Sequence, residues 1–394
     1  MLTFKILVLL LPGTSWYNIF MQYLAVLGRQ PKISLAELES QFSDVSIVAG
    51  SKNLLATFSS ETDPEIARLG GIIKLAQPID GMPEKFLGLF ASSTGFSSKF
   101  VIGISDYSAH ASARAAQGEA LKLKRTMKKA GFSMRVLPNK NAALSSATVF
   151  HNQLGENPGH FEFIKFGKKW YVGLGVQNIK AYAKRDQARP ARDAKNGMLP
   201  PKLAQILINL CGPLPRGARV LDPFCGTGVV LQEAILMGYK AYGTDASERI
   251  VEFARKNLKW LIESENMFSL SVGDAQDFVW EQPIDAVAFE GYLGPPMSQP
   301  PAEIKMKTVM ADVSSLYRNT LRNLSSQLKS GTPVVMAIPA WLRSDGHYQR
   351  LNLLDEISNM GYNVIKYKNL SQEDLLYFRD GQVVAREIIV LRKK

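Results

Sequence analysis

The stretch that decides the fold class is Asp222-Pro223-Phe224-Cys225-Gly226-Thr227-Gly228. The apolar pair Val220-Leu221 before it predicts a buried strand, and the residues after it predict a helix that ends before Gly238. A glycine-rich turn between a strand and a helix lets a ligand approach the backbone, while the helix start offers free N–H groups. The sequence therefore predicts a ligand site at this turn.

Acidic residues follow the next two predicted strands. Asp245 comes 23 residues after Asp222, and Asp274 follows Gly273. A carboxylate at the second strand end suits the two hydroxyls of a ribose, and one at the third can reach an adenine amino group. Leu231 stands where the dinucleotide motif G-x-G-x-x-G would have its third glycine. The pattern therefore favours an adenosyl ligand that lacks a pyrophosphate.

Strands alternate with helices from Arg219 onward, which predicts an α/β fold with a doubly wound, largely parallel sheet and helices on both faces. The predicted strands are 219–221, 240–244, 269–272, 286–289, 332–338, 363–367 and 386–391. The predicted helices are 202–211, 229–237, 248–261, 310–328 and 349–360. Tyr377 and Arg386-Glu387 flank a turn at Gly381, which predicts a final antiparallel hairpin without a chemical role.

Positive charge is concentrated in the first half of the chain. Residues 1–200 hold 25 Lys and Arg against 14 Asp and Glu, while the rest holds 22 against 21. The helix predicted over 113–130 is basic on one side, at Lys122, Lys124, Arg125, Lys128 and Lys129. A polyanion bound by this half is one interpretation, and a solvated, solubilising charge excess is the other.

The chain is long enough for two or three domains. We expect an extension at 1–20, an α+β domain at 21–90, a second small α+β domain at 91–176, a linker at 177–200 and the α/β domain at 201–394. Ser34 with Glu37 three residues later predicts a capping box at the start of the first helix. The apolar run at 6–11 is too short to cross a bilayer, and no membrane association is expected.

Cys211 and Cys225 are the two cysteines, and the four histidines are scattered. No spacing resembles a zinc site, so no metal is predicted. Few thiols fit a reducing cytoplasm. Within the glycine-rich turn, Cys225 is interpreted as a small buried packing residue more readily than as a nucleophile.

The turn at 222–228 resembles motif I of amino-group methyltransferases that act on nucleic acid bases. From Met21 onward the chain resembles the THUMP-domain RNA methyltransferases, the family of the tRNA guanosine-10 N2-methyltransferases. The resemblance rests on four stretches: Leu27-Gly28-Arg29-Gln30-Pro31 with Leu35-Ala36-Glu37-Leu38, Arg185-Asp186 with Arg192-Asp193, Met198-Leu199-Pro200-Pro201-Lys202-Leu203-Ala204, and Tyr377-Phe378-Arg379 with Arg386-Glu387.

This resemblance implies a Rossmann-like class I domain that binds S-adenosylmethionine, preceded by ferredoxin-like and THUMP-like domains that bind RNA. It places the cofactor at residues 222–228, its ribose at Asp245, its adenine at Asp274 and its cover at Met198 and Pro200. The residues expected to contact RNA, with tRNA favoured, are Lys122, Lys124, Arg125, Lys128, Lys129, Arg185, Arg189 and Arg192.

Amino-group methyltransferases carry an acid or amide, two prolines and an aromatic residue after the fourth strand. Here Glu290, Tyr292, Pro295 and Pro296 supply these residue types in a changed order. We expect Glu290 to accept a hydrogen bond from the target amine and Tyr292 to stack on the flipped base. A core packing role for Tyr292 is the alternative.

Together these features predict an RNA N-methyltransferase that modifies an exocyclic amine, with guanine N2 favoured. Two alternatives stay open: a DNA adenine or cytosine amino-methyltransferase, and an RNA-binding protein with a vestigial methylase domain. The sequence does not indicate an oligomeric state.

Overall fold

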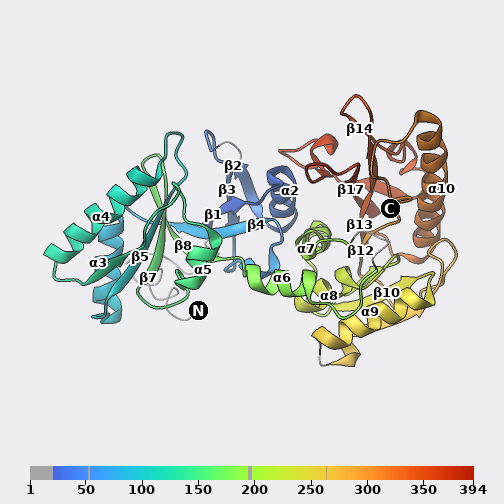
Figure 1. Cartoon of the computed structure of the whole chain (residues 1–394). Coiled ribbons are helices and arrows are strands. Elements are labelled where there is room, and N and C mark those ends of the chain that lie inside the picture. Colours follow the sequence, from blue (N-terminus) through green and yellow to red (C-terminus); the bar gives the residue numbers. More distant parts are fainter. Residues whose placement is uncertain (1–20, 52–53, 194–197, 263) are drawn as a thin grey trace. The chain divides into compact units, whose positions relative to one another are not determined.

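The computed structural model describes residues 21–51, 54–193, 198–262 and 264–394, which fall into two compact units (Figure 1). The first unit contains residues 21–31, 42–67 and 72–179. The second unit contains residues 32–41, 68–71 and 180–394. The extension predicted at 1–20 lies outside the described residues.

One eight-stranded sheet, in the order β2-β3-β1-β4-β8-β7-β5-β6, forms the first unit. Its strands are β1 (Met21–Leu27), β2 (Ser43–Ile47), β3 (Leu55–Ser60), β4 (Ile72–Pro78), β5 (Phe100–Asp106), β6 (Met134–Val136), β7 (His160–Phe166) and β8 (Lys169–Val176). Strand β5 runs parallel to β6 and β7, and the other recorded pairs are antiparallel. The predicted ranges 21–90 and 91–176 both supply strands to this sheet, and their separation into two domains stays a prediction.

Helices α3 (Pro83–Thr94) and α4 (Ala113–Lys129) pack on one face of this sheet, and α5 (Ser146–His151) packs on the other. Ser112 caps α4 by accepting a hydrogen bond from the Ala115 N–H, at 3.1 Å. The buried side of α4 repeats every three or four residues, at Ala116, Ala120, Leu123 and Met127. This repeat leaves the basic side of α4 in solvent.

The second unit contains a nine-stranded sheet whose main order is β11-β10-β9-β12-β13-β17-β15. Its strands are β9 (Arg219–Asp222), β10 (Lys240–Asp245), β11 (Phe268–Val272), β12 (Ala286–Glu290), β13 (Pro333–Leu342), β14 (Tyr348–Gln349), β15 (Tyr362–Val364), β16 (Leu376–Tyr377) and β17 (Val384–Lys393). The neighbours among the first five strands of this order, β11 to β13, run parallel to one another. Strand β17 runs antiparallel to β13 and β15. The predicted α/β, Rossmann-like fold class is confirmed.

Two apolar cores lie on the two faces of this sheet, and successive strand residues point alternately into one and the other. Ala286 and Ala288 point into the core with α7 (Pro201–Leu210), α8 (Val229–Leu236) and α9 (Glu248–Leu261). Val287 and Phe289 point into the core with α10 (Glu303–Gln327). The strand period of two thus gives helices on both faces, as Figure 1 shows for the second unit.

Helix α2 (Pro31–Gln41) comes early in the sequence, yet it belongs almost wholly to the second unit. Its residues Ile33 and Ala36 lie in the core that also contains α7 and α8. The buried Glu37 accepts hydrogen bonds from the N–H groups of Gly70 and Gly71, both at 2.8 Å, and from the Asn209 side chain at 2.7 Å. The core of the second unit is therefore assembled from three separate parts of the chain.

The capping box predicted at Ser34 and Glu37 is wrong. Helix α2 begins at Pro31, so Ser34 lies inside the helix and is buried. Proline is favoured at the first helical position because its missing N–H has no partner there in any case. Glu37 satisfies backbone donors at Gly70 and Gly71, outside its own helix.

The helix predicted over 349–360 is also wrong. The segment starts at the last residue of β14 and contains a short 3-10 helix, Leu354–Glu356, within a run of tight turns. Its apolar residues Leu351, Leu353, Ile357 and Met360 are buried. A period near three fits successive i→i+3 turns as well as an α-helix, and Asn352, Asp355 and Ser358 favour turns. Helix α10 also starts earlier than predicted, at Glu303 after two prolines.

The predicted linker contains a helix, α6 (Ile179–Gln187). Further short 3-10 helices are Ile66–Arg68, Glu265–Met267 and Gln372–Asp374. After α6, the backbone N–H and carbonyl of Ala191 bind the side chain of Asn257 on α9, each at 3.0 Å. This part of the linker is therefore fixed to the second unit. Among the residues that the structure describes, no helix is long and apolar enough to cross a membrane.

Candidate active site

A cavity of about 840 Å³ opens where strands β9, β10 and β12 end. The carboxyl ends of parallel strands meet at one edge of a sheet, which is the usual ligand site of open α/β folds. The predicted residues that line the cavity are Met198, Asp222, Pro223, Phe224, Cys225, Gly226, Thr227, Asp245, Asp274, Glu290, Tyr292, Pro295 and Pro296. Pro200 and Gly228 do not line it.

The turn between β9 and α8 depends on two glycines. Gly226 and Gly228 have φ values of +49° and +87°, in the region where a side chain is strained. A Cβ on Gly228 would also lie 3.3 Å from the Cβ of Ala254 on α9. The Cys225 N–H donates to the Thr244 carbonyl at 2.8 Å, which ties the turn to β10. The turn therefore keeps its backbone against the cavity.

Asp245 lies at the tip of β10 and supports the same turn. Its Oδ2 accepts from the Gly226 N–H at 3.1 Å, and its Oδ1 accepts from the Ser247 N–H at 3.0 Å. Burial raises the pKa of the Asp245 carboxyl, and these two hydrogen bonds oppose that increase. An ionised carboxylate has about four lone-pair positions, so Asp245 keeps acceptor capacity toward the cavity.

Asp222 and Cys225 are buried ionisable side chains of the turn. Asp222 Oδ1 accepts from the Phe224 N–H at 3.0 Å, and burial raises the pKa of its carboxyl well above the ordinary value. Burial likewise raises the pKa of the Cys225 thiol well above its ordinary value, so the reactive thiolate is disfavoured. The local environment therefore fits a packing role for Cys225.

Asp274 is exposed, and its Oδ1 accepts from the Gln276 N–H at 3.0 Å. Met198 lines the cavity from the linker, next to Leu199. Pro200 is instead the N-cap residue just before α7, where its carbonyl accepts from the Ala204 N–H at 3.1 Å. The linker thus reaches the cavity through the residues just before α7.

Glu290 ends β12 and is paired with a cation. The Nε of Arg386 on β17 donates to Glu290 Oε1, and the two side chains are only 6% and 13% exposed. Burial raises the pKa of the Glu290 carboxyl, and the Arg386 guanidinium opposes that increase. Within the described residues, no group donates a hydrogen bond to Glu290 Oε2.

The loop after Glu290 is held from the α10 side. The buried Tyr317 hydroxyl donates to the Tyr292 carbonyl at 2.9 Å, and a Cβ on Gly291 would come within 2.3 Å of that hydroxyl oxygen. The Tyr292 side chain is 48% exposed, which excludes the simple core packing considered as an alternative. Pro295 and Pro296 line the same cavity further along the loop.

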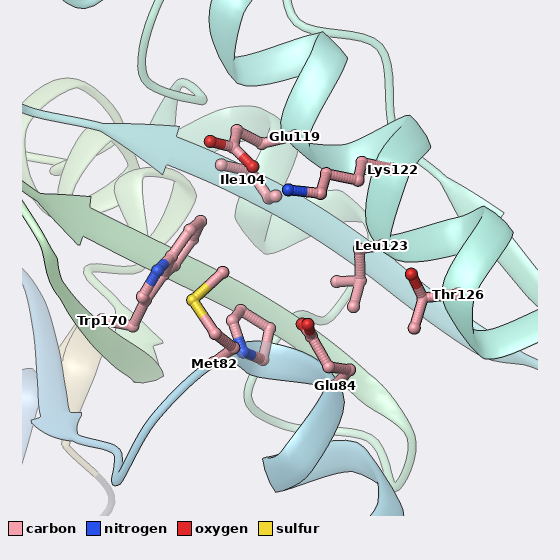
Figure 2. A pocket seen from close by; sticks show the side chains of 9 residues that line it. Met82, Glu84, Ile104, Glu119, Lys122, Leu123, Thr126 and Trp170 are labelled. Carbon is pink, nitrogen blue, oxygen red and sulfur yellow. The ribbon is translucent and has the colours of Figure 1, made fainter.

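The basic residues predicted on α4 are all exposed, at Lys122, Lys124, Arg125, Lys128 and Lys129. Figure 2 shows a small hollow beside α4, and the Lys122 side chain extends along it toward Glu119. Trp170 and Met82 close the opposite side. The hollow measures about 10 Å³, which is room for about one water molecule and not for a nucleotide.

The three arginines predicted at the linker have partners inside the second unit. Arg185 Nε donates to Glu233 Oε1 at 2.6 Å, and the Arg189 side chain is fully buried. Arg192 is exposed and donates to the carbonyls of Asp186 and Gln187. The structure therefore gives Arg185 and Arg189 an interior position that the sequence did not indicate.

Arg386 is a charged cavity residue to which sequence reasoning gave no role. The signal for it was an Arg386-Glu387 pair inside an otherwise apolar strand. Charges in a central strand are costly unless they are paired, and each of these has a partner: Glu290 for Arg386 and Arg350 for Glu387.

The domain that contains this cavity is similar to known methyltransferase domains. Residues 189–342 match the family model described as the RMKL-like methyltransferase domain. A relative from Methanothermobacter thermautotrophicus, named tRNA (guanine(10)-N2)-dimethyltransferase, is 36% identical over 159 residues, or 40% of this chain and 44% of the relative. A relative of the same name from Pyrococcus abyssi is 29% identical over 201 residues, or 50% and 54%.

The chain thus spans about half the length of the curated relatives it matches. Among solved structures, TrmN from Thermus thermophilus aligns over 95% of this chain and 100% of its own, at 17% identity and a TM-score of 0.46. The matched methyltransferase domain includes the turn at 222–228 and the loop at 290–296.

Proposed function

We propose that the chain is an S-adenosylmethionine-dependent RNA methyltransferase that modifies an exocyclic amine of tRNA, with guanine N2 favoured. The observation that carries this proposal is that one cavity is lined both by Asp245 with the glycine turn and by Glu290. Glu290 Oε2 accepts no hydrogen bond from the described residues. The relatives named tRNA (guanine(10)-N2)-dimethyltransferase support the choice of polymer and base.

The residues around the turn fit S-adenosylmethionine. Asp245 has acceptor capacity left for the two ribose hydroxyls, and the exposed Asp274 can accept from an adenine amino group. Met198 and Leu199 supply apolar cover, and the glycine turn leaves its backbone uncovered. When bound, this cofactor supplies an electrophilic methyl group on a sulfonium sulfur.

The chain's own residues orient and deprotonate the amine. Glu290 Oε2 accepts a hydrogen bond from the exocyclic N–H, which directs the nitrogen lone pair away from the carboxylate. Each methylation requires the loss of one N–H proton, and Glu290, whose pKa is raised by burial, is an acceptor at the cavity wall. Tyr292 is exposed enough to stack on a base taken out of its helix.

The first unit is proposed to bind RNA in the manner of a THUMP domain. The last eight residues of its helix α4 include five exposed cationic side chains, which suit a phosphate backbone. Among described residues, Cys211 and Cys225 are free thiols, which fits the reducing cytoplasm that we propose as the place of action.

Labelled cofactor incubated with bulk tRNA, ribosomal RNA and DNA, followed by nucleoside analysis, tests the proposal. We expect label in tRNA, recovered as N2-methylated guanosine. Label confined to DNA would overturn the choice of RNA and favour the amino-methyltransferase of DNA. Calorimetry that detects no binding of S-adenosylmethionine would leave only an RNA-binding protein with a vestigial domain.

A further inference from the structure

Arg386 is a buried cation with unused hydrogen-bond donors in the cavity wall. Its residue exposure is 5%, and of its five N–H groups only the one on Nε has a partner within the described residues, Glu290 Oε1. The terminal nitrogens of Arg386 are not among the atoms buried without a partner, and the residue lines the cavity, so these donors are open to a ligand there. A ligand in the cavity can therefore supply the acceptors that the protein does not.

A second arginine close in the fold, Arg350, allows a direct comparison with Arg386. Arg350 pairs with Glu387, the residue next to Arg386, and its terminal nitrogens donate to Glu387 Oε1, the Gln372 carbonyl and the Glu373 carbonyl at 2.9–3.1 Å. Arg350 does not line the cavity. The terminal nitrogens of Arg350 thus have protein acceptors, whereas those of Arg386 have none within the described residues.

We propose that Arg386 is a specificity residue that contacts the target base, so that Glu290 and Arg386 together read the edge of guanine. This inference rests on the proposed function. The guanine edge presents the N2 amine and N1–H as donors and O6 as an acceptor. The Glu290 carboxylate accepts from the two donors, and a terminal N–H of Arg386 donates to O6.

The ion pair itself sets the required geometry. Because the Arg386 Nε is bound to Glu290 Oε1, donor and acceptor groups are fixed side by side on strands β17 and β12. 2-Aminopurine keeps the C2 amine but lacks O6 and N1–H, so it leaves the Arg386 donors without an acceptor. A site built to hydrogen-bond a polar group rejects an analogue that lacks it, because its own buried groups stay unpaired.

Equilibrium binding of nucleoside monophosphates to the full chain tests this inference without any turnover. Guanosine, 2-aminopurine riboside and adenosine monophosphates are compared by ligand-detected NMR, with saturating S-adenosylhomocysteine to keep adenosine out of the cofactor site. We expect the guanosine compound to bind at least roughly tenfold more tightly than either of the others. Equal binding of the guanosine and 2-aminopurine compounds would overturn the inference.

Two arginine variants separate base reading from folding. Arg386→Lys keeps the positive charge beside Glu290 but loses the planar fork, and we expect the preference for guanosine over 2-aminopurine to fall by roughly tenfold. Arg350→Lys makes the same change in the pair outside the cavity and should leave the preference unchanged. Calorimetric binding of S-adenosylhomocysteine checks that both variants are folded.

A variant of Arg386 that keeps the full guanosine preference while folded would show that the residue does not contact the base. The two proposals fail differently. Discrimination of guanosine without methyl transfer to any RNA would overturn the proposed function alone. Methylation of guanosine in tRNA without discrimination against 2-aminopurine would overturn the reading by Arg386 alone.

Discussion

Glu290 is the strand-end carboxylate to which the proposed function assigns the amine proton. Replacing it by glutamine keeps the shape of the side chain but removes the negative charge that accepts the amine proton. We expect Glu290→Gln to lower methyl transfer to tRNA by roughly 10²–10⁴, the usual range for a general base. Cofactor affinity, measured by calorimetry, should be retained, and full turnover by this variant would exclude the assigned role.

Asp245 is expected to contribute to cofactor binding. Asp245→Asn removes the charge that the ribose hydroxyls bind, and hydrogen bonds to charged groups contribute about 1.5–3 kcal/mol. We therefore expect the Kd for S-adenosylmethionine to rise roughly ten- to a hundredfold. Asp355→Asn, an exposed substitution away from the cavity, is the matched control. If both variants bind alike, Asp245 does not hold the cofactor.

Glu37 gives the second unit a pH-dependent stability. Burial raises the pKa of Glu37 from 4.5 to about 7, against the hydrogen bonds from Asn209, Gly71 and Gly70. Below pH 4.5 the carboxyl is protonated in both the folded and the unfolded chain. As the pH rises to 7, the unfolded chain loses the proton first, so the free energy of unfolding falls, by about 3 kcal/mol in total.

Comparison with Glu37→Gln isolates this contribution, because the variant cannot ionise and other titrations cancel. The stability of the wild-type chain relative to the variant should be lower at pH 8 than at pH 4.5, as measured by denaturant unfolding. A relative stability that does not change with pH would contradict the raised pKa.

At the scale of elements, close packing between the 68–71 segment and α7 leaves no room for a side chain. A Cβ on Gly70 would lie 2.1 Å from the Lys202 carbonyl oxygen. We expect Gly70→Ala to destabilise the second unit by about 1–3 kcal/mol, the usual cost of overpacking. Gly88→Ala in α3 is the matched control, since its Cβ meets nothing within 4 Å and alanine favours a helix. Similar melting temperatures for the two variants would argue against this packing.

The elements that the sequence predicted well are those whose pattern depends on local physics. The strands around 222–228 and their helices follow from apolar periodicity and glycine turns, and the fold class is confirmed. The helix predicted at 349–360 failed because apolar residues at 351, 353, 357 and 360 can be buried by successive tight turns as well as by an α-helix.

Long-range partners could not be predicted from local pattern. The ion pair between Glu290 and Arg386 joins residues 96 positions apart, and only the placement of β17 next to β13 brings Arg386 to the cavity. The partners of Arg185 and Glu37 likewise depend on tertiary contacts. In contrast, the sequence could predict the cavity residues at 222–227, Asp245 and Glu290. They lie at the ends of parallel strands, which share one edge of the sheet.

At the scale of the whole molecule, the basic face of α4 is expected to hold RNA by charge. Replacing Lys124 and Lys128 by glutamine should weaken tRNA binding and lower the slope of log Kd against log salt by about 0.7–0.9 for each lost phosphate contact. Cofactor binding should not change. The control replaces the exposed Lys256 and Lys329 of the second unit. An unchanged salt dependence in the α4 variant would remove the support for RNA binding by this face.

The second unit is also expected to need its early segments. A chain that starts at Lys180 lacks α2 and residues 68–71, so Asn209 loses its buried acceptor and the core loses Ile33 and Ala36. We expect this fragment to lose its cooperative thermal transition and its affinity for S-adenosylmethionine. A fragment that melts like the full chain and binds the cofactor would show that α2 is dispensable.

The position of α2 in the sequence has a consequence for synthesis of the protein. Helix α2 emerges from the ribosome before α7 and α8 have been synthesised. These are the helices that share a core with Ile33 and Ala36 on the apolar side of α2. During that interval the nascent chain carries an uncovered apolar helix between β1 and β2 of a sheet that can already form. Completion of the core of the second unit is thus a late event, and chaperones have the most to protect during this interval.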